Sequence, residues 1–143
     1  MSAGFLLDTN VPSELTRLLP DVLVVDWVDA QDNASLYPSV VSVGELRRGF
    51  TILSPGKKRL QLEEWLERYL LPLFADRILP VTHSVGDRWG VLSGECQLRG
   101  APLNTADEMI AATALEYDLT VVTRNVRDFT GLGVIVFSPW DGA

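Results

Sequence analysis

Short apolar runs, separated by longer stretches with helical spacing, predict a chain that alternates strands and helices. The candidate strands are residues 5–7, 36–41, 78–81, 119–123 and 134–137. In the first run and the last two, apolar residues follow one another without alternation, which is typical of strands buried on both faces. The pattern therefore predicts an α/β fold with a parallel sheet between helical layers.

Helical periodicity fills the segments between these runs. Asn10 can cap a first helix with Pro12 in its opening turn, and residues 22–30 indicate a second. Further helices are expected to begin at Ser42 and Thr105, and Gly100 can supply the left-handed residue that ends the helix before Thr105. The expected helix 60–74 carries a wide hydrophobic stripe, which can be core or a partner surface: Leu62, Trp65, Leu66, Tyr69, Leu70 and Leu73.

Three acidic residues stand where such a fold brings them to one edge of the sheet. Asp8 follows the first strand directly, while Glu45 and Asp107 lie in the first turns of the helices expected to begin at Ser42 and Thr105. In a parallel βαβ unit the helix runs antiparallel to its strands, so its first turn lies at their carboxyl ends. Asp8, Glu45 and Asp107 are therefore predicted to converge on one rim.

Like charges gathered on a rim repel each other unless a cation lies among them or they retain their protons. A divalent metal is the simpler explanation, and carboxylate oxygens without Cys or His favour Mg²⁺ or Mn²⁺. Such an ion can activate a water and neutralise charge on a phosphodiester. The hypothesis is therefore a metal-dependent hydrolase of phosphodiester bonds.

Each acidic residue also has a structural explanation. Residues 42–45 and 105–108 both fit the capping box, in which the final glutamate accepts a hydrogen bond from the first residue of its own helix. Asp107 would then gain only an interaction with the helix dipole, worth about 0.3–1 kcal/mol. Asp8 could begin an Asx turn. The coincidence of the three positions favours the metal site over these separate explanations.

The composition fits one globular domain spanning residues 1–143. The chain is 47% hydrophobic and 22% charged, and its single cysteine, Cys96, excludes an intramolecular disulfide. The first residues lack the positive region of a signal peptide, and no apolar run approaches the ~18 residues of a membrane span. We therefore expect a cytoplasmic protein without membrane association. The net charge of −7 argues against nucleic-acid binding, although basic residues group locally near Arg48 and Arg124.

The acidic residues lie in segments that resemble a known family. Four segments are similar to those of PIN-domain ribonucleases, and among these of VapC-type toxins from bacterial toxin–antitoxin pairs: FLLDTN at 5–10, SVGELRRG at 42–49, DEMIAA at 107–112 and VVTRNVRDF at 121–129. They span nearly the whole chain in the expected order. The resemblance implies a three-layer α/β/α sandwich with a central parallel sheet of four or five strands, Mg²⁺- or Mn²⁺-dependent cleavage of RNA, a homodimer, and a cognate antitoxin that blocks the active groove.

The resemblance also assigns catalytic roles by position. Asp8, Glu45 and Asp107 would hold the metal and orient the attacking water, and hydrolysis would leave 5′-phosphate and 3′-hydroxyl ends. Asn125 falls where many relatives place a fourth acidic residue. An amide offers a dipole in place of a full charge, so the sequence leaves open whether a second metal binds.

Polar residues beside these positions are expected to support the site. Thr9 and Thr123, both at strand ends, are candidates to orient the carboxylates by hydrogen bonds. Asp128 can contribute from the next turn, or cap the local turn before Phe129. Arg48 and Arg124 can contact substrate phosphates, or form surface salt bridges.

Two other functions fit parts of the sequence. A haloacid-dehalogenase-like phosphatase would use Asp8 as a nucleophile, although the second acid of its D-x-D pattern is Asn10 here. A catalytically inactive PIN-fold protein would only bind a partner or nucleic acid, with Asn125 as a sign of lost catalysis. His83, the sole histidine, is interpreted as structural.

Overall fold

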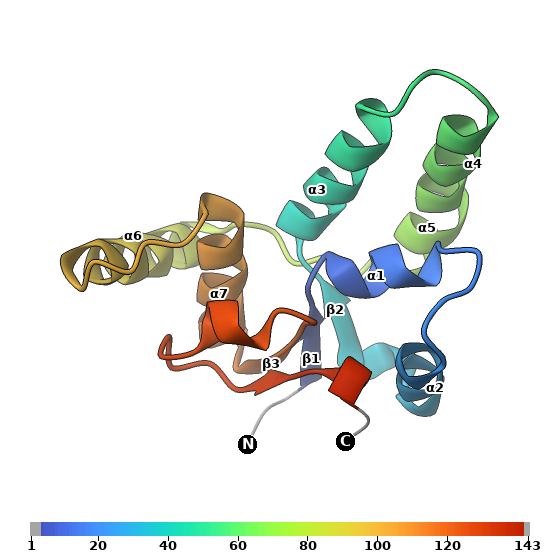
Figure 1. Ribbon diagram of the computed structural model, residues 1–143. Helices are drawn as coiled ribbons and strands as arrows, with labels where there is room; N and C mark the ends of the chain where they lie inside the picture. The colour runs from blue at the N-terminus through green and yellow to red at the C-terminus, as the bar shows by residue number, and fades with distance from the viewer. Residues whose placement is uncertain (1–3, 142–143) are drawn as a thin grey trace.

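The computed structural model describes residues 4–141 (Figure 1). Residues 1–3, where we expected no signal segment, lie outside the described part, as do residues 142–143. Four parallel strands form one sheet in the order β2-β1-β3-β4. Their bounds are β1 Gly4–Leu7, β2 Leu36–Pro38, β3 Leu119–Val122 and β4 Val136–Phe137. The predicted α/β fold with a parallel sheet is confirmed.

Helices cover both faces of this sheet. The α-helices are α1 Asn10–Leu15, α2 Val22–Ala30, α3 Val40–Thr51, α4 Lys57–Trp65, α5 Leu71–Leu73, α6 His83–Leu98 and α7 Thr105–Tyr117. Short 3-10 helices are η1 Asn33–Ser35, η3 Val126–Phe129 and η4 Pro139–Asp141, and η2 Leu66–Leu70 is a π-helix. Helices α3 and α4 project together from the body as an arm (Figure 1). Within residues 4–141, no helix is both long and apolar enough to cross a membrane.

The hydrophobic core is divided by the sheet into two clusters. Leu7 and Val122 pack on one face, with residues of α1, α2, α3 and η2. Leu6 and Val121 pack on the other face, with residues of α6 and α7. Successive side chains of a strand point to opposite faces, so a strand needs a continuous apolar run to serve both clusters. The lack of alternation in the sequence is explained by this double burial.

Three helices have capping residues other than those expected, although α7 begins at Thr105 as predicted. Ser39 caps α3 by accepting from the Val41 N–H at 3.0 Å, so Ser42 is already helical and its hydroxyl donates to the Leu7 carbonyl at 3.4 Å. Asn104 caps α7 in place of Thr105. The cap position of α1 is Thr9, so Asn10 is the first helical residue. Both capping boxes proposed from the sequence are therefore wrong.

Two other expected elements differ in extent. Residues 78–81 make a single parallel bridge between Leu79 and Ser39 beside β2, because Pro80 has no N–H to continue a ladder. The expected helix 60–74 contains the π segment η2, in which the Leu71 N–H bonds back to the Leu66 carbonyl, just before Pro72. The stripe on this helix is only partly core, since Leu66 is buried and Tyr69 is 56% exposed.

Candidate active site

Asp8 lies at the carboxyl edge of the sheet, directly after β1. Its N–H donates to the Val122 carbonyl at 2.9 Å, which continues the β1–β3 pairing by one residue. Its side chain is buried and accepts two short hydrogen bonds, from the Thr9 N–H at 2.8 Å and from the Thr123 hydroxyl at 2.7 Å. The carboxylate is therefore fixed in orientation by both neighbouring strand ends.

Glu45 reaches the same edge from α3. Because α3 begins at Val40, Glu45 lies in the second helical turn and not in the first. The Thr9 hydroxyl donates to Glu45 Oε1, so Thr9 contacts Asp8 through its backbone and Glu45 through its side chain. A single residue thus connects two of the three acids.

Asp107 is the third residue of α7 and is held by Asn104. The Asn104 side chain accepts from the Asp107 N–H at 2.8 Å, and its amide nitrogen donates to Asp107 Oδ2 at 2.9 Å. Asn104 was absent from the sequence prediction. Its signal was its position just before an expected helix, where Asn is among the preferred capping residues.

The charges of the three acids act on one another at this edge. Burial raises the pKa of Asp107 to about 6, and the charges of Asp8, Asp128 and Glu45 add to this rise. Burial also raises the pKa of Asp8, against the opposing hydrogen bonds from Thr123 and Thr9, and Glu45 and Asp128 raise it further. No ion pair formed within residues 4–141 neutralises Asp8, Glu45 or Asp107.

The acids form a loose cluster and not a closed cage. Across the described residues, no group of three His, Cys, Asp or Glu side chains is close enough to hold one ion. Each carboxylate instead accepts from a neutral donor: Asp8 from Thr123, Glu45 from Thr9 and Asp107 from Asn104. All the candidate ligands are oxygens, and Mg²⁺ is usually held through one or two carboxylates with waters completing its shell. The donor set therefore fits a hard divalent cation.

Asn10 joins the two loops that carry the site, a role that the sequence did not reveal. Its amide nitrogen donates to the Thr123 hydroxyl at 3.2 Å and to Asp8 Oδ2 at 3.4 Å. Its amide oxygen accepts from the Arg124 N–H at 3.2 Å. The sequence suggested only a helix cap for Asn10, because the loop after β3 lies more than a hundred positions away and no local pattern reports that contact.

The polarity of the Thr123 hydroxyl follows from a count of its partners. Its oxygen accepts from Asn10 and from the Asn125 N–H at 3.0 Å, so both lone pairs are used. Its single proton is therefore directed to Asp8 Oδ2. Thr123 is thereby fixed as a donor to this carboxylate.

Asn125 and Asp128 lie at opposite ends of the same short turn. Asn125 is exposed and precedes η3, and its backbone contacts Thr123. Asp128 is exposed within η3, and its charge raises the pKa of both Asp8 and Asp107. Among the hydrogen bonds of residues 4–141, none involves the Asp128 carboxylate, so the turn-capping role expected for it is wrong. The fourth negative charge near the site therefore comes from Asp128.

The two expected substrate-binding arginines differ in their surroundings. Arg48 is exposed near the end of α3, where its neighbour Arg47 forms ion pairs with Glu63 and Glu67. Arg124 follows Thr123 at the site, and its guanidinium carbon lies 5.8 Å from the centre of the Trp140 ring. His83 lies at the exposed start of α6, on a different segment.

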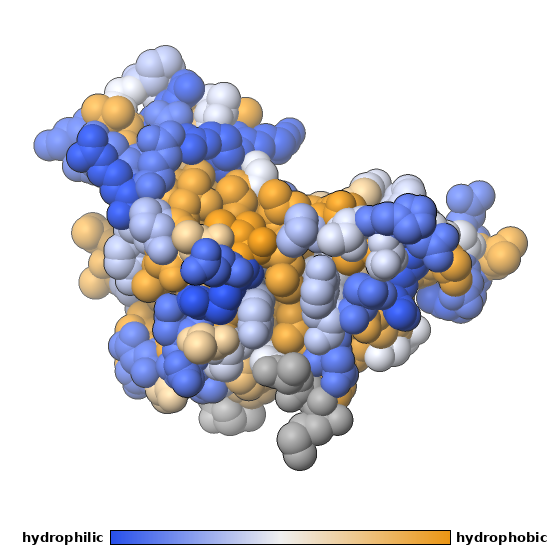
Figure 2. All heavy atoms as spheres, turned by 180° about the vertical axis from the view of Figure 1, so that it is seen from behind, coloured by the Kyte–Doolittle hydropathy of each residue, from blue (hydrophilic) through white to orange (hydrophobic). Residues whose placement is uncertain are grey.

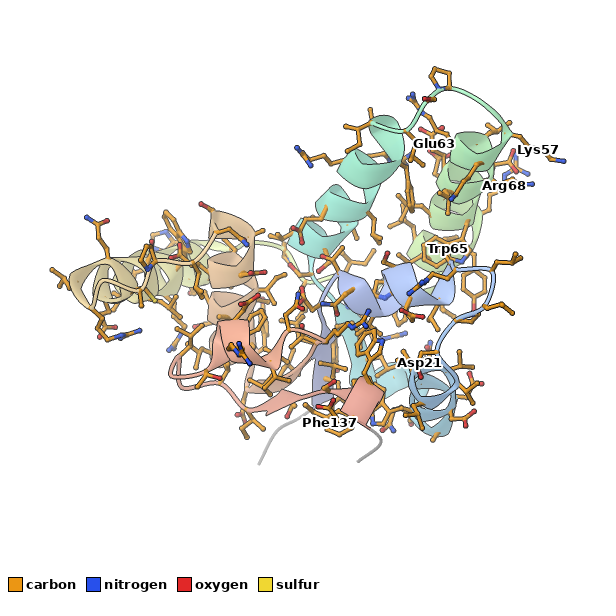
Figure 3. All side chains as sticks on the ribbon, in the orientation of Figure 1. Asp21, Lys57, Glu63, Trp65, Arg68 and Phe137 are labelled. Atoms are coloured by element: carbon orange, nitrogen blue, oxygen red, sulfur yellow. The ribbon has the colours of Figure 1, made fainter. Side chains whose placement is uncertain are left out.

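A groove of about 860 Å³ begins at Thr9 and Glu45 and runs between α1 and the arm. Its walls include the apolar side chains of Phe50, Leu62 and Trp65. Figure 3 shows Trp65 at the base of the arm, beside α1. The acidic cluster is therefore continuous with a hydrophobic channel.

Several known proteins are similar to this chain in sequence and in fold. The model of the PIN domain family matches residues 5–133. The toxin FitB of Neisseria gonorrhoeae is 43% identical over 94% of this chain and 97% of its own length. The VapC ribonuclease Y4jK of Sinorhizobium fredii is 37% identical over 96% of this chain and 98% of its own length. The crystal structure of FitAcB from Neisseria gonorrhoeae covers 95% of this chain and 98% of its own, at 43% identity and a TM-score of 0.89.

Proposed function

The chain belongs to the PIN domain family, and from this membership we propose that it is a metal-dependent endoribonuclease and the toxin component of a toxin–antitoxin pair. The observation that carries the proposal is that Asp8 and Glu45 both accept hydrogen bonds from Thr9 at the carboxyl edge of the sheet, where their charges also raise the pKa of Asp107. Relatives of nearly equal length include a VapC ribonuclease and a toxin. Cleavage of RNA in the cytoplasm follows as the proposed activity.

Asp8, Glu45 and Asp107 would hold the cation, Mg²⁺ or Mn²⁺, with one or two of the carboxylates as direct ligands and waters between the cation and the rest. When bound, the cation lowers the pKa of water and offsets negative charge on the phosphodiester. Thr9, Thr123 and Asn104 keep the carboxylates oriented, each through the hydrogen bond described above. These neutral donors add no positive charge that would compete with the cation.

The attacking water gives its proton to the acidic cluster. In the metal-free protein, burial and the charges of neighbouring acids raise the pKa of Asp107 to about 6, so this carboxylate holds a proton more readily than an ordinary aspartate. The reaction needs no 2′-hydroxyl, so its products carry 5′-phosphate and 3′-hydroxyl ends. Asn125 contributes no charge to this step, and Asp128 supplies the additional negative charge.

A cognate antitoxin would occupy the groove that leads from the site. The groove offers apolar walls between α1 and the arm, and its open end contains Glu45. A partner segment that fills it with apolar side chains can place a basic side chain among the acids, and the net charge of −7 favours a basic partner. The same groove then explains both binding and inhibition.

A homodimer is the proposed assembly. Figure 2 shows a hydrophobic area at the base of the arm, on the face turned away from the view of Figure 1. Val40, at the start of α3, is 43% exposed, and its N–H contacts Leu79 in the segment that passes this base. Contiguous exposed apolar surface of this kind is typical of subunit contacts.

The function is tested with purified protein and a mixed RNA pool. Wild type is incubated with Mg²⁺, Mn²⁺ or chelator, and the cut ends are sequenced, with Asp107→Asn as the matched variant. We expect cleavage that requires the metal, leaves 5′-phosphates and is lost in Asp107→Asn. Ends with 2′,3′-cyclic phosphate would contradict the mechanism. If the wild type cleaved no RNA with either metal or with chelator, the result would favour the catalytically inactive PIN-fold binding protein. Turnover of a chromogenic phosphate ester that persists in Glu45→Gln would identify a phosphatase.

A further inference from the structure

The side chain of Arg124 lies over an aromatic ring and forms no ion pair with an acid of residues 4–141. Its backbone N–H donates to Asn10 Oδ1, and Asn10 also donates to Asp8, so the start of its side chain is tied to the acidic cluster. Its guanidinium carbon lies 5.8 Å from the centre of the Trp140 ring. That separation is within the range in which an aromatic face attracts a cation.

The guanidinium has no acidic partner in the described structure. None of the ion pairs among residues 4–141 includes Arg124, although the chain carries more acidic than basic residues. The side chain is exposed to solvent. An arginine that lies over an aromatic ring keeps its planar fork of N–H groups available, and this fork matches the oxygens of a phosphate.

The ring that supports Arg124 is itself fixed. Trp140 belongs to η4, and it packs against the hydrophobic cluster on the α1 and α3 side of the sheet. The Asp141 N–H donates to the Ser138 carbonyl at 3.3 Å, which closes the turn that carries the ring. Trp140 is therefore a rigid platform at the end of β4, next to the strand that leads to Thr123.

A hollow lies beside Arg124. It has a volume of about 580 Å³ and is lined by Arg124, Asn125, Arg127 and neighbouring residues of the turn. Two arginines, Arg124 and Arg127, and one acid, Asp128, line this hollow. The arginines outnumber the acid along this path, which favours a polyanion.

We propose that Arg124, held on Trp140, binds a phosphate of the RNA strand adjacent to the phosphate that is cleaved, and that the strand continues into the hollow lined by residues 124–128. This assignment rests on the proposed ribonuclease function and adds the path of the substrate. Arg124 binds substrate, and Trp140 is a positioning residue that acts through it. The contact acts equally on bound substrate and transition state, so it lowers KM and leaves kcat unchanged.

The test measures binding of a fluorescein-labelled pool of random 12-nucleotide RNA, by anisotropy in chelator over a range of salt concentrations. Arg124→Gln should weaken binding about 10-fold at low salt and reduce the slope of log affinity against log salt by about 0.7, the value for one lost phosphate contact on a single strand. Trp140→Leu should weaken binding roughly 2- to 5-fold and keep the slope, because the charge remains while its support is lost. Trp140→Phe should restore most of the affinity. With Mg²⁺ present, KM should rise in Arg124→Gln while kcat stays within about twofold.

The matched control is Arg68→Gln. It removes the same charge from an exposed arginine of η2, which Figure 3 places far from Phe137 and hence from the end of β4. Unchanged affinity and slope in Arg124→Gln, or an equal loss in Arg68→Gln, would overturn the subsite while wild-type cleavage still upheld the ribonuclease. A wild type that neither binds nor cleaves RNA would overturn both. Arg124→Lys separates charge from geometry: affinity equal to wild type would show that the ring-supported fork is not used.

Discussion

Two regions of this small protein contain buried carboxylates, and the pKa values of these carboxylates are shifted in opposite directions. At the sheet edge, burial and neighbouring acids raise the pKa of Asp8 and Asp107. In α1, Glu14 is as buried as Asp8, and burial alone would raise its pKa, but hydrogen bonds from the Asp21 N–H and from Arg17 outweigh that effect and lower it. The Asp21 N–H lies 2.8 Å from Glu14 Oε2, and Arg17 forms an ion pair with Oε1 at 3.4 Å.

The opposite pKa shifts distinguish an acid that stabilises the fold from acids suited to catalysis. Glu14 is compensated by donors and a cation, so it stabilises the loop between α1 and α2. The acids at the edge have only neutral donors, so their mutual repulsion persists in the folded protein. A repelling cluster retained in an otherwise satisfied structure is typical of a functional site.

The largest contrast is expected in catalysis. Asp8→Asn should lower kcat for RNA cleavage by on the order of 10³-fold, the scale of losing one electrostatic contact with the transition state. Glu14→Gln should keep kcat within about threefold, because Glu14 does not contact the acidic cluster. Single-turnover cleavage of one RNA under saturating Mg²⁺ measures both. An equal loss in the two variants would remove the distinction between the regions.

Magnesium should act on one region only. At free Mg²⁺ about 100 times its Kd, wild type and Glu14→Gln should each gain about 2.7 kcal/mol in unfolding free energy, and Asp8→Asn should gain much less. Urea unfolding with and without Mg²⁺ measures the gain, and Ca²⁺ provides a comparison of ion size. A gain that is the same in Asp8→Asn would place the cation elsewhere.

Glu14→Gln should destabilise the protein by about 1–2 kcal/mol at pH 7, because the charged acceptor of two hydrogen bonds is replaced by a neutral one. The folded-state pKa of Glu14 is lowered, so its stabilisation is present above the ordinary pKa of a glutamate and is lost as the pH falls through the folded value. The unfolding free energies of wild type and variant should therefore differ at pH 7 and become equal as the pH falls below the folded-state pKa of Glu14. A difference that persists in acid would point to lost packing.

Asp107→Asn should have the opposite sign and a smaller size. The pKa of Asp107 is raised to about 6, so the folded state favours the protonated group, and that advantage is lost as the pH rises through 6. At pH 7.5 without metal, the variant should be more stable than wild type by about 1 kcal/mol, a figure reduced for the partial exposure of the side chain. In metal-free thermal unfolding, the gap should narrow as the pH falls from 6 and close below the ordinary aspartate pKa of 3.8. Destabilisation at pH 7.5 would show that Asn104 compensates the charge.

The sequence was sufficient for features that depend on one segment at a time. The unbroken apolar residues before Asp8 and around Val121 and Val122 predicted parallel strands, and the rule that helices start at the carboxyl edge predicted where Asp107 would lie. These inferences need only the local direction of the chain. The sheet and the placement of Asp8 and Asp107 could therefore be predicted.

Helix starts failed where two capping residues compete. Ser39 and Ser42 stand three positions apart, and only the path of the chain decides which one begins α3. Ser39 does so because the chain still belongs to the sheet at its bridge to Leu79. Glu45 therefore lies most of a turn further along its helix than expected, where it accepts a hydrogen bond from the Thr9 hydroxyl.

Contacts between distant loops were beyond any local pattern. Asn10 meets Thr123 across 113 positions, and Arg124 meets Trp140 after the chain has formed β4 and turned back. Each residue type is ordinary in its own segment. Their roles depend on a shared sheet edge, which exists only after folding.

The order of the strands in the sheet also determines when the active site can form during translation. β1 is made early and pairs with β3, and Thr123 is separated from Asp8 by 115 residues. At about 5–20 residues per second, a ribosome needs roughly 6–23 s to make that interval. Throughout this time the nascent chain lacks β3, which pairs with β1. The ribosome therefore completes most of the chain before Asp8 can meet Thr123 and an active site can form next to ribosomal RNA.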